Sequence, residues 1–512
     1  MKAPFSWKQD GLASVVVFLV AIPLCLGIAL ASGAPLFSGI ISGIVGGIVV
    51  GFLSDSELMV SGPAAGLTVI VLAAISDLGD FRLFLAAVVV AGALQMLLGV
   101  LRAGVIGYYF PTAVIKGMLA AIGLILILKQ IPHAIGYDVD AMGDDAFRQA
   151  TGETTFSAIA HAVQQLQWGA AIVALVSLPL LFLWGKGFLK PLKALPAPLV
   201  VVALGVLMNA AFAAFAPGLV ISDSHLVSLP VPASFGDFLG QFTLPAWSGF
   251  AMPQVWQVGL VLAIVASLES LLSLQATDEM DPLKREASTD RELLAQGAGN
   301  LASGLIGGLP VTGVIVRSAT NVSAGARTRW SAILHGVLLL LSAIAFAGIL
   351  NLIPLSALAA VLLHVGYKLA SPELFRSVVR KGFAYAVPFF VTVLAILFTD
   401  LLRGVLIGLA VGIVFILRDQ LASPPFTEVS PKGAVLRRLQ LHGNVNFLHK
   451  SALQQELDRV PAGSRLELDA RHTRRLDPDV LDVIRHFRTT AQERNIDYRL
   501  VGVPDAGSTA NL

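Results

Sequence analysis

Residues 61–66, with the sequence Ser-Gly-Pro-Ala-Ala-Gly, begin one short apolar segment, and residues 308–313, with the sequence Gly-Leu-Pro-Val-Thr-Gly, begin another. Both segments are short for a membrane-spanning helix, which needs about 20 apolar residues. Paired short segments interrupted by glycine and proline, one in each half of a chain, are the best sequence indication of a binding site inside a membrane transporter. These two segments therefore decide how the whole chain is interpreted.

The composition is that of a chain solvated mainly by lipid. Hydrophobic residues make up 56% of the 512 residues and charged residues only 13%, whereas a soluble domain has about 25% charged residues. The net charge of +2 does not indicate nucleic-acid binding. The lone cysteine, Cys25, excludes an intrachain disulfide and a cysteine-rich metal site. An enzyme within the membrane is not indicated, because the sequence offers neither a convincing pair of nucleophile and base nor a metal cluster.

Apolar runs predict an all-α polytopic membrane protein with about fourteen helical segments. They are expected near residues 11–31, 36–53, 62–76, 81–101, 105–128, 167–185, 197–215, 253–276, 291–307, 312–325, 328–350, 353–370, 383–398 and 401–417. The two short segments are the third and the tenth, so they take equivalent places in repeat 1, about 11–215, and repeat 2, about 253–417. Seven segments per half turn the second half upside down, which predicts an inverted-topology repeat.

Basic residues gather in the loops on one side of this topology. With a cytoplasmic N-terminus, that side carries Lys2, Lys8, Arg102, Lys186, Lys190, Lys193, Lys284, Arg285, Arg327, Arg329, Arg376, Arg380 and Lys381. The stretch from Phe215 to Trp256, on the opposite side, contains neither Lys nor Arg. The positive-inside rule therefore predicts cytoplasmic termini in a bacterial inner membrane. Residues 278–292 are expected to form a solvated cytoplasmic loop with helix ends.

A helix that begins inside the bilayer presents unpaired N–H groups and the positive end of its dipole. Two such ends facing each other would cradle a small inorganic anion without a charged side chain. The predicted anion-binding residues are Ser61, Gly62, Pro63, Ala64, Ala65, Thr312, Gly313 and Val314. Arg317 follows about one turn later, and it either adds positive potential at the site or forms a structural ion pair.

Glu269 is the other costly charge inside a predicted membrane segment. A carboxylate there is expected to be paired, protonated or bound to a cation. Ser273 lies four residues on, hence on the same helical face, and would supply a neutral oxygen. The pattern predicts either a Na⁺ site formed by Glu269 and Ser273 or a coupling H⁺ carried by Glu269, with a purely structural role as the alternative. No organic cofactor is expected.

These motifs together resemble the SulP family of anion permeases. The resemblance is carried by residues 23–27 (Pro-Leu-Cys-Leu-Gly), 61–63, 269–273 (Glu-Ser-Leu-Leu-Ser), 309–313 and 317–319 (Arg-Ser-Ala), and it extends over essentially the whole chain. It implies a core domain moving against a gate domain in an elevator-type cycle, with the anion between the two half-helices, and a homodimer in membrane lipid. It also places Cys25 among the substrate-binding candidates.

The same resemblance makes bicarbonate import the first expectation, because residues 269–317 are similar to the branch found beside carbonic anhydrase. There are two departures from the family pattern, of which the first removes a polar contact to the substrate and the second leaves the coupling ion open between Na⁺ and H⁺. Leu24 stands where many members have glutamine, and Ile315 aligns with a threonine of sodium-coupled relatives. The alternatives are a sulfate or dicarboxylate symporter, a nucleobase carrier, and an uncoupled anion exchanger or channel.

A soluble domain is expected after the membrane domain, which spans residues 1–420. Within residues 428–512, strand-like and helix-like patterns alternate at 435–441, 448–459, 465–468, 478–494 and 498–503. This alternation predicts a small cytoplasmic α/β domain. It resembles a shortened STAS domain, which implies docking or dimer contact. At the turn where family members often have a phosphorylatable hydroxyl, residues 477–480 are Asp-Pro-Asp-Val.

Overall fold

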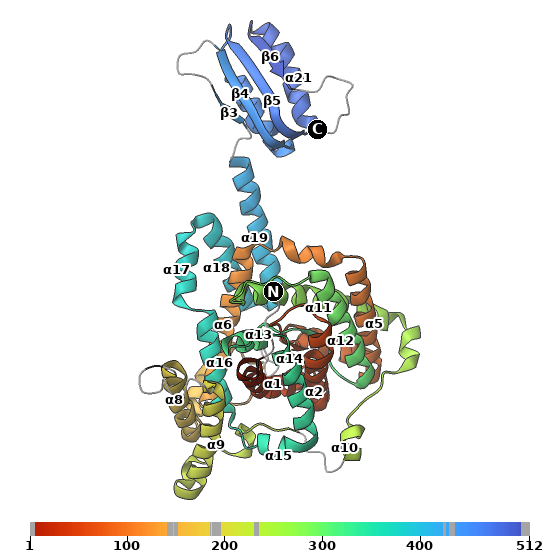
Figure 1. The fold of residues 1–512 in the computed structure, drawn as a ribbon, viewed down its shortest axis with the longest axis vertical. Coiled ribbons are helices and arrows are strands. Elements are labelled where there is room, and N and C mark those ends of the chain that lie inside the picture. The colour runs from red at the N-terminus through yellow and green to blue at the C-terminus, as the bar shows by residue number, and fades with distance from the viewer. Residues whose placement is uncertain are drawn as a thin grey trace. The chain divides into compact units, whose positions relative to one another are not determined.

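The computed structural model describes residues 6–140, 147, 152–184, 186, 196–229, 235–422, 426–429 and 436–502. The chain divides into two compact units, Met1–Ala410 and Val411–Leu512. The first is almost entirely helical, and the second contains a four-stranded sheet with helices (Figure 1). Each unit has its own buried apolar core.

Helices occur in each of the fourteen segments where membrane helices are predicted. The first half contains α1 (Leu12–Ala31), α2 (Leu36–Val45), α3 (Gly51–Leu53), α4 (Thr68–Leu78), α5 (Phe81–Val100), α6 (Thr112–Ala134), α7 (Thr155–Gln164), α8 (Trp168–Leu183) and α9 (Ala197–Phe215). The second half contains α10 (Phe235–Gly240), α11 (Pro253–Met280), α12 (Thr289–Ile306), α13 (Ile315–Ser323), α14 (Trp330–Leu341), α15 (Ala347–Leu350), α16 (Leu355–Leu369), α17 (Pro372–Arg380), α18 (Phe383–Phe398) and α19 (Leu401–Ala422).

Eight helical stretches within the described part of the chain are long and apolar enough to cross a membrane. The pair α7 and α8, bent by 114°, makes a ninth if it counts as one span. Three shorter apolar helices include the stretch Ala65–Leu78, which holds α4. The molecule therefore has the mostly helical, polytopic fold predicted for a membrane protein, with several elements too short to cross on their own.

Prolines set several helix boundaries. Pro253 begins α11, and Pro354 immediately precedes α16, because proline lacks the N–H that the first helical turn leaves unpaired. The segment predicted at 105–128 begins earlier than the observed helix, because a proline again sets where the helix starts. A 3₁₀ turn, Ala103–Tyr109, comes first, and α6 starts only after Pro111.

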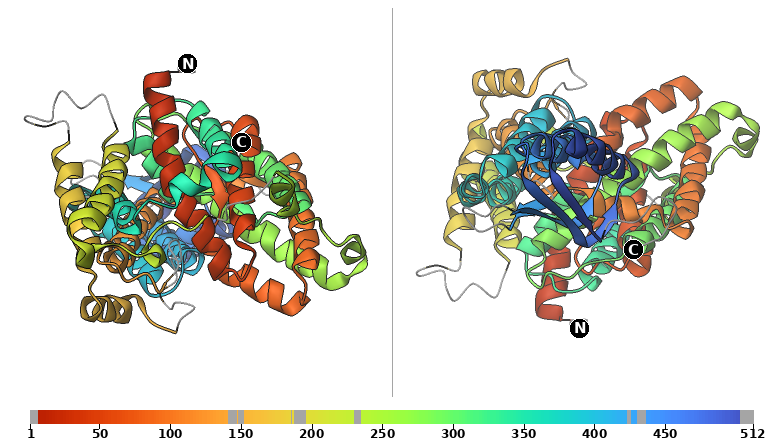
Figure 2. Two further views of the ribbon diagram at one scale, coloured as in Figure 1. Left: turned by 90° about the horizontal axis from the view of Figure 1, so that it is seen from below. Right: turned by 90° about the horizontal axis from the view of Figure 1, so that it is seen from above.

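The membrane unit consists of two groups of packed helices. In one group, α5 packs against α11 and α12, and in the other, α6 packs against α16 and α18 while α8 packs against α16. Figure 2 shows the yellow α8 and α9 on the opposite side of this unit from the orange α5, as Figure 1 does. The first group falls within the helices expected for the core and the second within those expected for the gate.

The second unit is a four-stranded sheet in the order β3 (Phe426–Glu428), β4 (Leu436–Val445), β5 (Arg465–Leu476) and β6 (Asp497–Val501), with helices α20 (Lys450–Asp458) and α21 (Pro478–Glu493). β4, β5 and β6 are parallel, whereas the unpredicted β3 runs antiparallel to β4. At the Asp-Pro-Asp-Val turn, the Asp477 side chain accepts a hydrogen bond from the Asp479 N–H and caps α21. The predicted α/β alternation is confirmed.

Candidate functional site

Two strands of three residues, β1 (Ser61–Pro63) and β2 (Val311–Gly313), pair in the buried interior of the membrane unit. They are antiparallel, with Ser61 opposite Gly313 and Pro63 opposite Val311. After β1 the chain enters a 3₁₀ turn and α4, and soon after β2 it enters α13. The prediction that the two interrupted segments meet is confirmed, and their opposite directions agree with two halves of opposite topology.

The hydrogen bonding around this strand pair indicates that an anion would bind at a different place from the one predicted. Two N–H groups of β2 and that of the next residue donate inside the core, from Val311 to Asn300 Oδ1 at 2.6 Å, from Gly313 to Ser270 Oγ at 3.3 Å and from Val314 to the Val60 carbonyl at 2.9 Å. The first turn of α13, starting at Ile315, has N–H groups with no acceptor inside the helix. An anion would therefore find its donors further along the chain than the predicted segment Thr312–Val314.

Two amide side chains on α12 hold the strands in place. Asn300 Nδ2 donates to the Val311 carbonyl at 2.9 Å, while its Oδ1 accepts from the N–H of the same residue. Four residues earlier, Gln296 Nε2 donates to Ser61 Oγ and to Glu292 Oε1, both at 2.7 Å. The sequence interpretation missed these residues. Their spacing of four within a small-residue, apolar segment was the available signal, since it aligns polar groups on one helical face.

A cavity of about 70 Å³ lies where the first turns of the two half-helices approach α11. Its lining residues are Ala65, Gly66, Thr68, Val69, Ile122, Ile125, Glu269, Ser273, Val314, Ile315, Val316, Asp400 and Leu401. A single water needs roughly 10–15 Å³ of such space, so the cavity has room for a few waters or one small oxyanion. Helices of both groups contribute, because α4, α11 and α13 belong with the core and α6 and α19 with the gate.

The predicted site residues divide into those that line this cavity and those that support it. Ala65, Val314, Glu269 and Ser273 line it. The remaining candidates are buried residues outside its lining, namely Cys25, Ser61, Gly62, Pro63, Ala64, Thr312, Gly313 and Arg317. Asp400, which the sequence interpretation did not single out, also lines the cavity and forms an ion pair with Arg403 at 3.2 Å.

Arg317 is completely buried beside β1. Its Nη2 donates to Cys25 Sγ at 3.2 Å, and a Cβ placed on Gly62 would lie only 2.1 Å from its Nη1. Within the described residues, neither Nε nor Nη1 of this arginine has a hydrogen-bond partner. Glycine at position 62 therefore makes room for the guanidinium, which is not part of the cavity lining.

The Glu269 carboxylate lies against the first turn of the first half-helix. A Cβ placed on Gly66 would lie 3.0 Å from Glu269 Oε1. Ser273, on the same face of α11, is 1% exposed, and its Cβ would lie 3.1 Å from a Cβ placed on Gly313. The two predicted cation-coupling residues therefore lie between the two half-helices, where a bound cation would face a bound anion at short range.

Replacing Gly66 with alanine tests this geometry. The new methyl group would press on the carboxylate of Glu269, so we expect roughly tenfold weaker anion binding, in the range of about 1–3 kcal/mol typical of overpacking. Calorimetry on the purified variant would measure it. The control is Gly218→Ala, where a Cβ meets open space. Equal binding by both variants would place the anion elsewhere.

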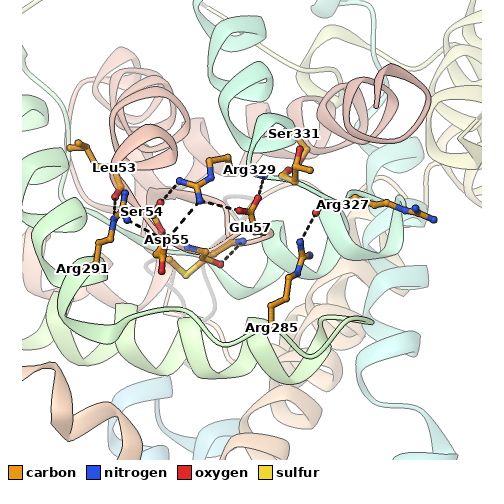
Figure 3. A network of polar contacts seen from close by, with 12 residues as sticks. Leu53, Ser54, Asp55, Glu57, Arg285, Arg291, Arg327, Arg329 and Ser331 are labelled. Atoms are coloured by element: carbon orange, nitrogen blue, oxygen red, sulfur yellow. Dashed lines mark hydrogen bonds and ion pairs between the residues drawn. The ribbon is translucent and has the colours of Figure 1, made fainter. Parts of the chain in front are cut away.

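A network of ion pairs joins the loops at one end of the core helices (Figure 3). Arg329 pairs with Glu57 at 3.0 Å and donates to the Ser54 carbonyl at 2.7 Å, while Arg291 pairs with Asp55 at 3.3 Å. The segment after α3 is thereby fixed to the start of α12 and to the turn before α14. These charges lie on the side that the positive-inside pattern assigns to the cytoplasm, and they make that end of the core one connected unit.

Residues 278–292 are only in part the solvated loop that was expected. Desolvation opposes ionisation of Asp281, but hydrogen bonds from Arg285 outweigh it and hold the pKa of Asp281 below its ordinary value. Asp281 is itself only 4% exposed, and Glu292 is completely buried and accepts a hydrogen bond from Ser54 Oγ at 2.5 Å, so neither carboxylate is solvated as expected. The expectation was wrong for Glu292, because this residue begins the polar row of α12 that continues through Gln296 to β1.

Paired interrupted helices, one from each half of a chain, are typical of membrane transporters. The sequence profile described as the Sulfate permease family matches residues 7–391, and the chain belongs to this family. It is therefore an integral, multi-pass anion transporter and not an enzyme.

Two relatives and one solved structure show what the chain is similar to. YvdB of Bacillus subtilis, whose assignment as a sulfate transporter is itself provisional, is 29% identical over 80% of this chain and 74% of its own length. The bicarbonate transporter BicA of Picosynechococcus is 24% identical over 70% of this chain, and the match spans only 61% of that protein. The structure of the murine anion transporter Slc26a9 has a TM-score of 0.68 at 15% identity, over 99% of this chain and 87% of that one. The last likeness concerns the fold alone.

Proposed function

We propose that this protein is a secondary active transporter that imports bicarbonate, coupled to Na⁺ or H⁺. The observation that carries the proposal is the shared cavity, in which the first turns of both half-helices and the side chains of Glu269 and Ser273 meet within about 70 Å³. Helix N-termini favour an anion, and a buried carboxylate favours a cation or a proton. Binding the two together lowers the cost of burying either charge, which is the physical basis of symport.

The mechanism that fits this arrangement is an elevator-type cycle. The strand pair, α12 and the ion-pair network connect the site to the core helices, while α6 and α19 line only one wall of the cavity. Movement of the core against the gate would carry the whole cavity from one side of the membrane to the other. The full topology proposed here has fourteen spans in an inverted repeat, with cytoplasmic termini in a bacterial inner membrane.

The C-terminal unit is proposed to be a STAS-like domain, and the working form of the transporter a homodimer. Parallel strands β4, β5 and β6 with two helices support the domain assignment. The capping role of Asp477 supports a structural rather than a phosphorylated turn at the start of α21. The anion path itself lies among the membrane helices.

Measurement of ion-driven uptake would distinguish among the possible substrates. The purified full chain in liposomes would be given labelled bicarbonate, sulfate or fumarate, each with an inward Na⁺ gradient, an inward H⁺ gradient or neither. We expect bicarbonate to accumulate with one of the two gradients. Accumulation of sulfate instead would support the alternative that the provisional assignment of YvdB favours. Equal uptake with and without gradients would contradict symport.

A further inference from the structure

A second, larger cavity of about 410 Å³ lies among α1, α8, α9, α13 and α16. Val16 and Leu181 provide part of an apolar wall, and Trp184 lies at the end of α8. The turn after α13 closes another side with Ala324 and Gly325. This volume falls within the range of about 300–1,000 Å³ that is usual for pockets of medium-sized ligands, and it is several times larger than the cavity at the half-helices.

The polar groups around this cavity favour a negative ligand. His364 and Lys368 lie one turn apart on α16 and both line it, together with the Thr320 and Ser323 side chains of α13. Neither Asp nor Glu is found among its described lining residues. The exposed Lys186 comes soon after α8, whose end lines the cavity.

In the described part of the chain, His364 lacks the polar contacts that would make it purely structural, and Lys368 is an exposed residue whose ammonium is accessible to a ligand. His364 Nδ1 is buried and has no hydrogen-bond partner within the described residues, although the ring packs edge-on against Phe182 at 4.8 Å. Lys368 forms no ion pair with a described carboxylate. A buried polar atom without a partner normally indicates a missing ligand or water.

This cavity is separate from the proposed transport site. α13 contributes Val314, Ile315 and Val316 to the smaller cavity, but only Thr320 and later residues to the larger one. Between these sets, Ala319 is buried in an apolar cluster with Val316, which lines the smaller cavity, and Val361, which lines the larger one. The larger cavity opens toward the ends of α8 and α16, which the basic loops assign to the cytoplasmic side.

We propose that this cavity binds the phosphate headgroup of an anionic phospholipid from the cytoplasmic leaflet. The Lys368 ammonium and the His364 ring would hold the phosphate oxygens, the apolar wall would receive the glycerol and the first part of an acyl chain, and Trp184 would lie at the interface, where tryptophan is enriched. Basic pockets between membrane helices on the cytoplasmic side are suited to such headgroups. Because core and gate helices both contribute, a bound lipid would bridge the two groups.

Lipid retention measured by native mass spectrometry tests this proposal. The purified full chain would be titrated with dioleoyl phosphatidylglycerol, dioleoyl phosphatidylcholine or soluble sn-glycerol 3-phosphate. We expect a preference for phosphatidylglycerol, and a loss of about fivefold in its apparent affinity for Lys368→Gln, as expected for one lysine at a membrane surface. The matched control, Arg380→Gln, removes an exposed charge at the same end outside the cavity and should change the affinity less than twofold.

His364→Gln keeps the inference testable if Lys368→Gln fails to fold, because the proposal requires either change to weaken phosphatidylglycerol binding. Equal losses for the cavity variants and for Arg380→Gln would indicate nonspecific attraction and overturn the proposal. Retention of glycerol phosphate as strong as that of the lipid would overturn the lipid as the occupant. Equal binding of phosphatidylglycerol and phosphatidylcholine would also overturn the proposal of an anionic lipid.

Discussion

Glu269→Gln is expected to abolish concentrative anion uptake, so that the internal concentration rises no further than the external one. The amide has nearly the same shape as the carboxylate, but it can neither balance a Na⁺ charge nor exchange a proton across the cavity. Downhill exchange of labelled for unlabelled anion should continue, since the half-helix N-termini remain. The measurement is a time course of uptake into liposomes under the driving gradient, followed by exchange without a gradient.

Glu279→Gln is the matched control for this experiment. Glu279 lies on the same helix but outside the cavity, where it forms an ion pair with Lys116 at 3.0 Å and is 35% exposed. Its neutralisation should leave accumulation near the level of the unmodified protein. If Glu269→Gln accumulates the anion as the control does, Glu269 has no part in coupling and the symport proposal fails.

Asn300→Leu is expected to cause the largest loss of stability. The change leaves the N–H and the carbonyl of Val311 buried without their side-chain partner, and it also removes the bond to Gln95 Oε1 at 2.6 Å. Each of these three abandoned buried groups costs about 1–3 kcal/mol, so the free energy of unfolding should fall by about 3–9 kcal/mol. Anion affinity should fall with it, because β2 leads directly into the first turn of α13.

Asn209→Leu separates the two effects. Asn209 of α9 makes a similar two-sided bond, accepting from the Ile221 N–H at 2.8 Å and donating to its carbonyl at 3.3 Å, but it lies far along the chain from either strand. The Asn209→Leu variant should have a lower free energy of unfolding. The fraction of it that remains folded should bind the anion as tightly as the unmodified protein does. Thermal unfolding and calorimetric titration of both variants make the comparison. A variant at Asn300 that binds the anion normally would show that β2 does not position the site.

The half-helices were predictable because their chemistry is local. Gly62 and Pro63 interrupt an apolar pattern, and so does Pro310 in the second half. Glu269 was predictable for a related reason, since an isolated carboxylate within an apolar helix is costly and therefore conspicuous. The meeting of the two segments followed from placing these interruptions at matching positions of two halves with opposite topology, whereas their pairing as the short strands β1 and β2 was not predicted.

The supporting contacts could not be predicted in the same way. Glu292 stands next to charged residues in the sequence, so it resembles a loop residue, and its burial depends on how α12 packs against the segment after α3. Asn300 binds a residue close in sequence, but only because the chain reverses at residues 307–310. Asp400 reaches the cavity through the packing of α18 and α19, which no local pattern specifies.

The short strand pair has a consequence for how the protein is made. Ser61 and Gly313 are 252 residues apart by their numbers, yet each is the other's partner in the ladder. At a synthesis rate of about 5–20 residues per second, the edge of the first strand waits about 10–50 s for the second to leave the ribosome. An N-terminal half released early would thus carry an open strand edge inside the bilayer, where backbone groups without partners are most costly. Quality control during insertion must tolerate this unfinished intermediate for that time.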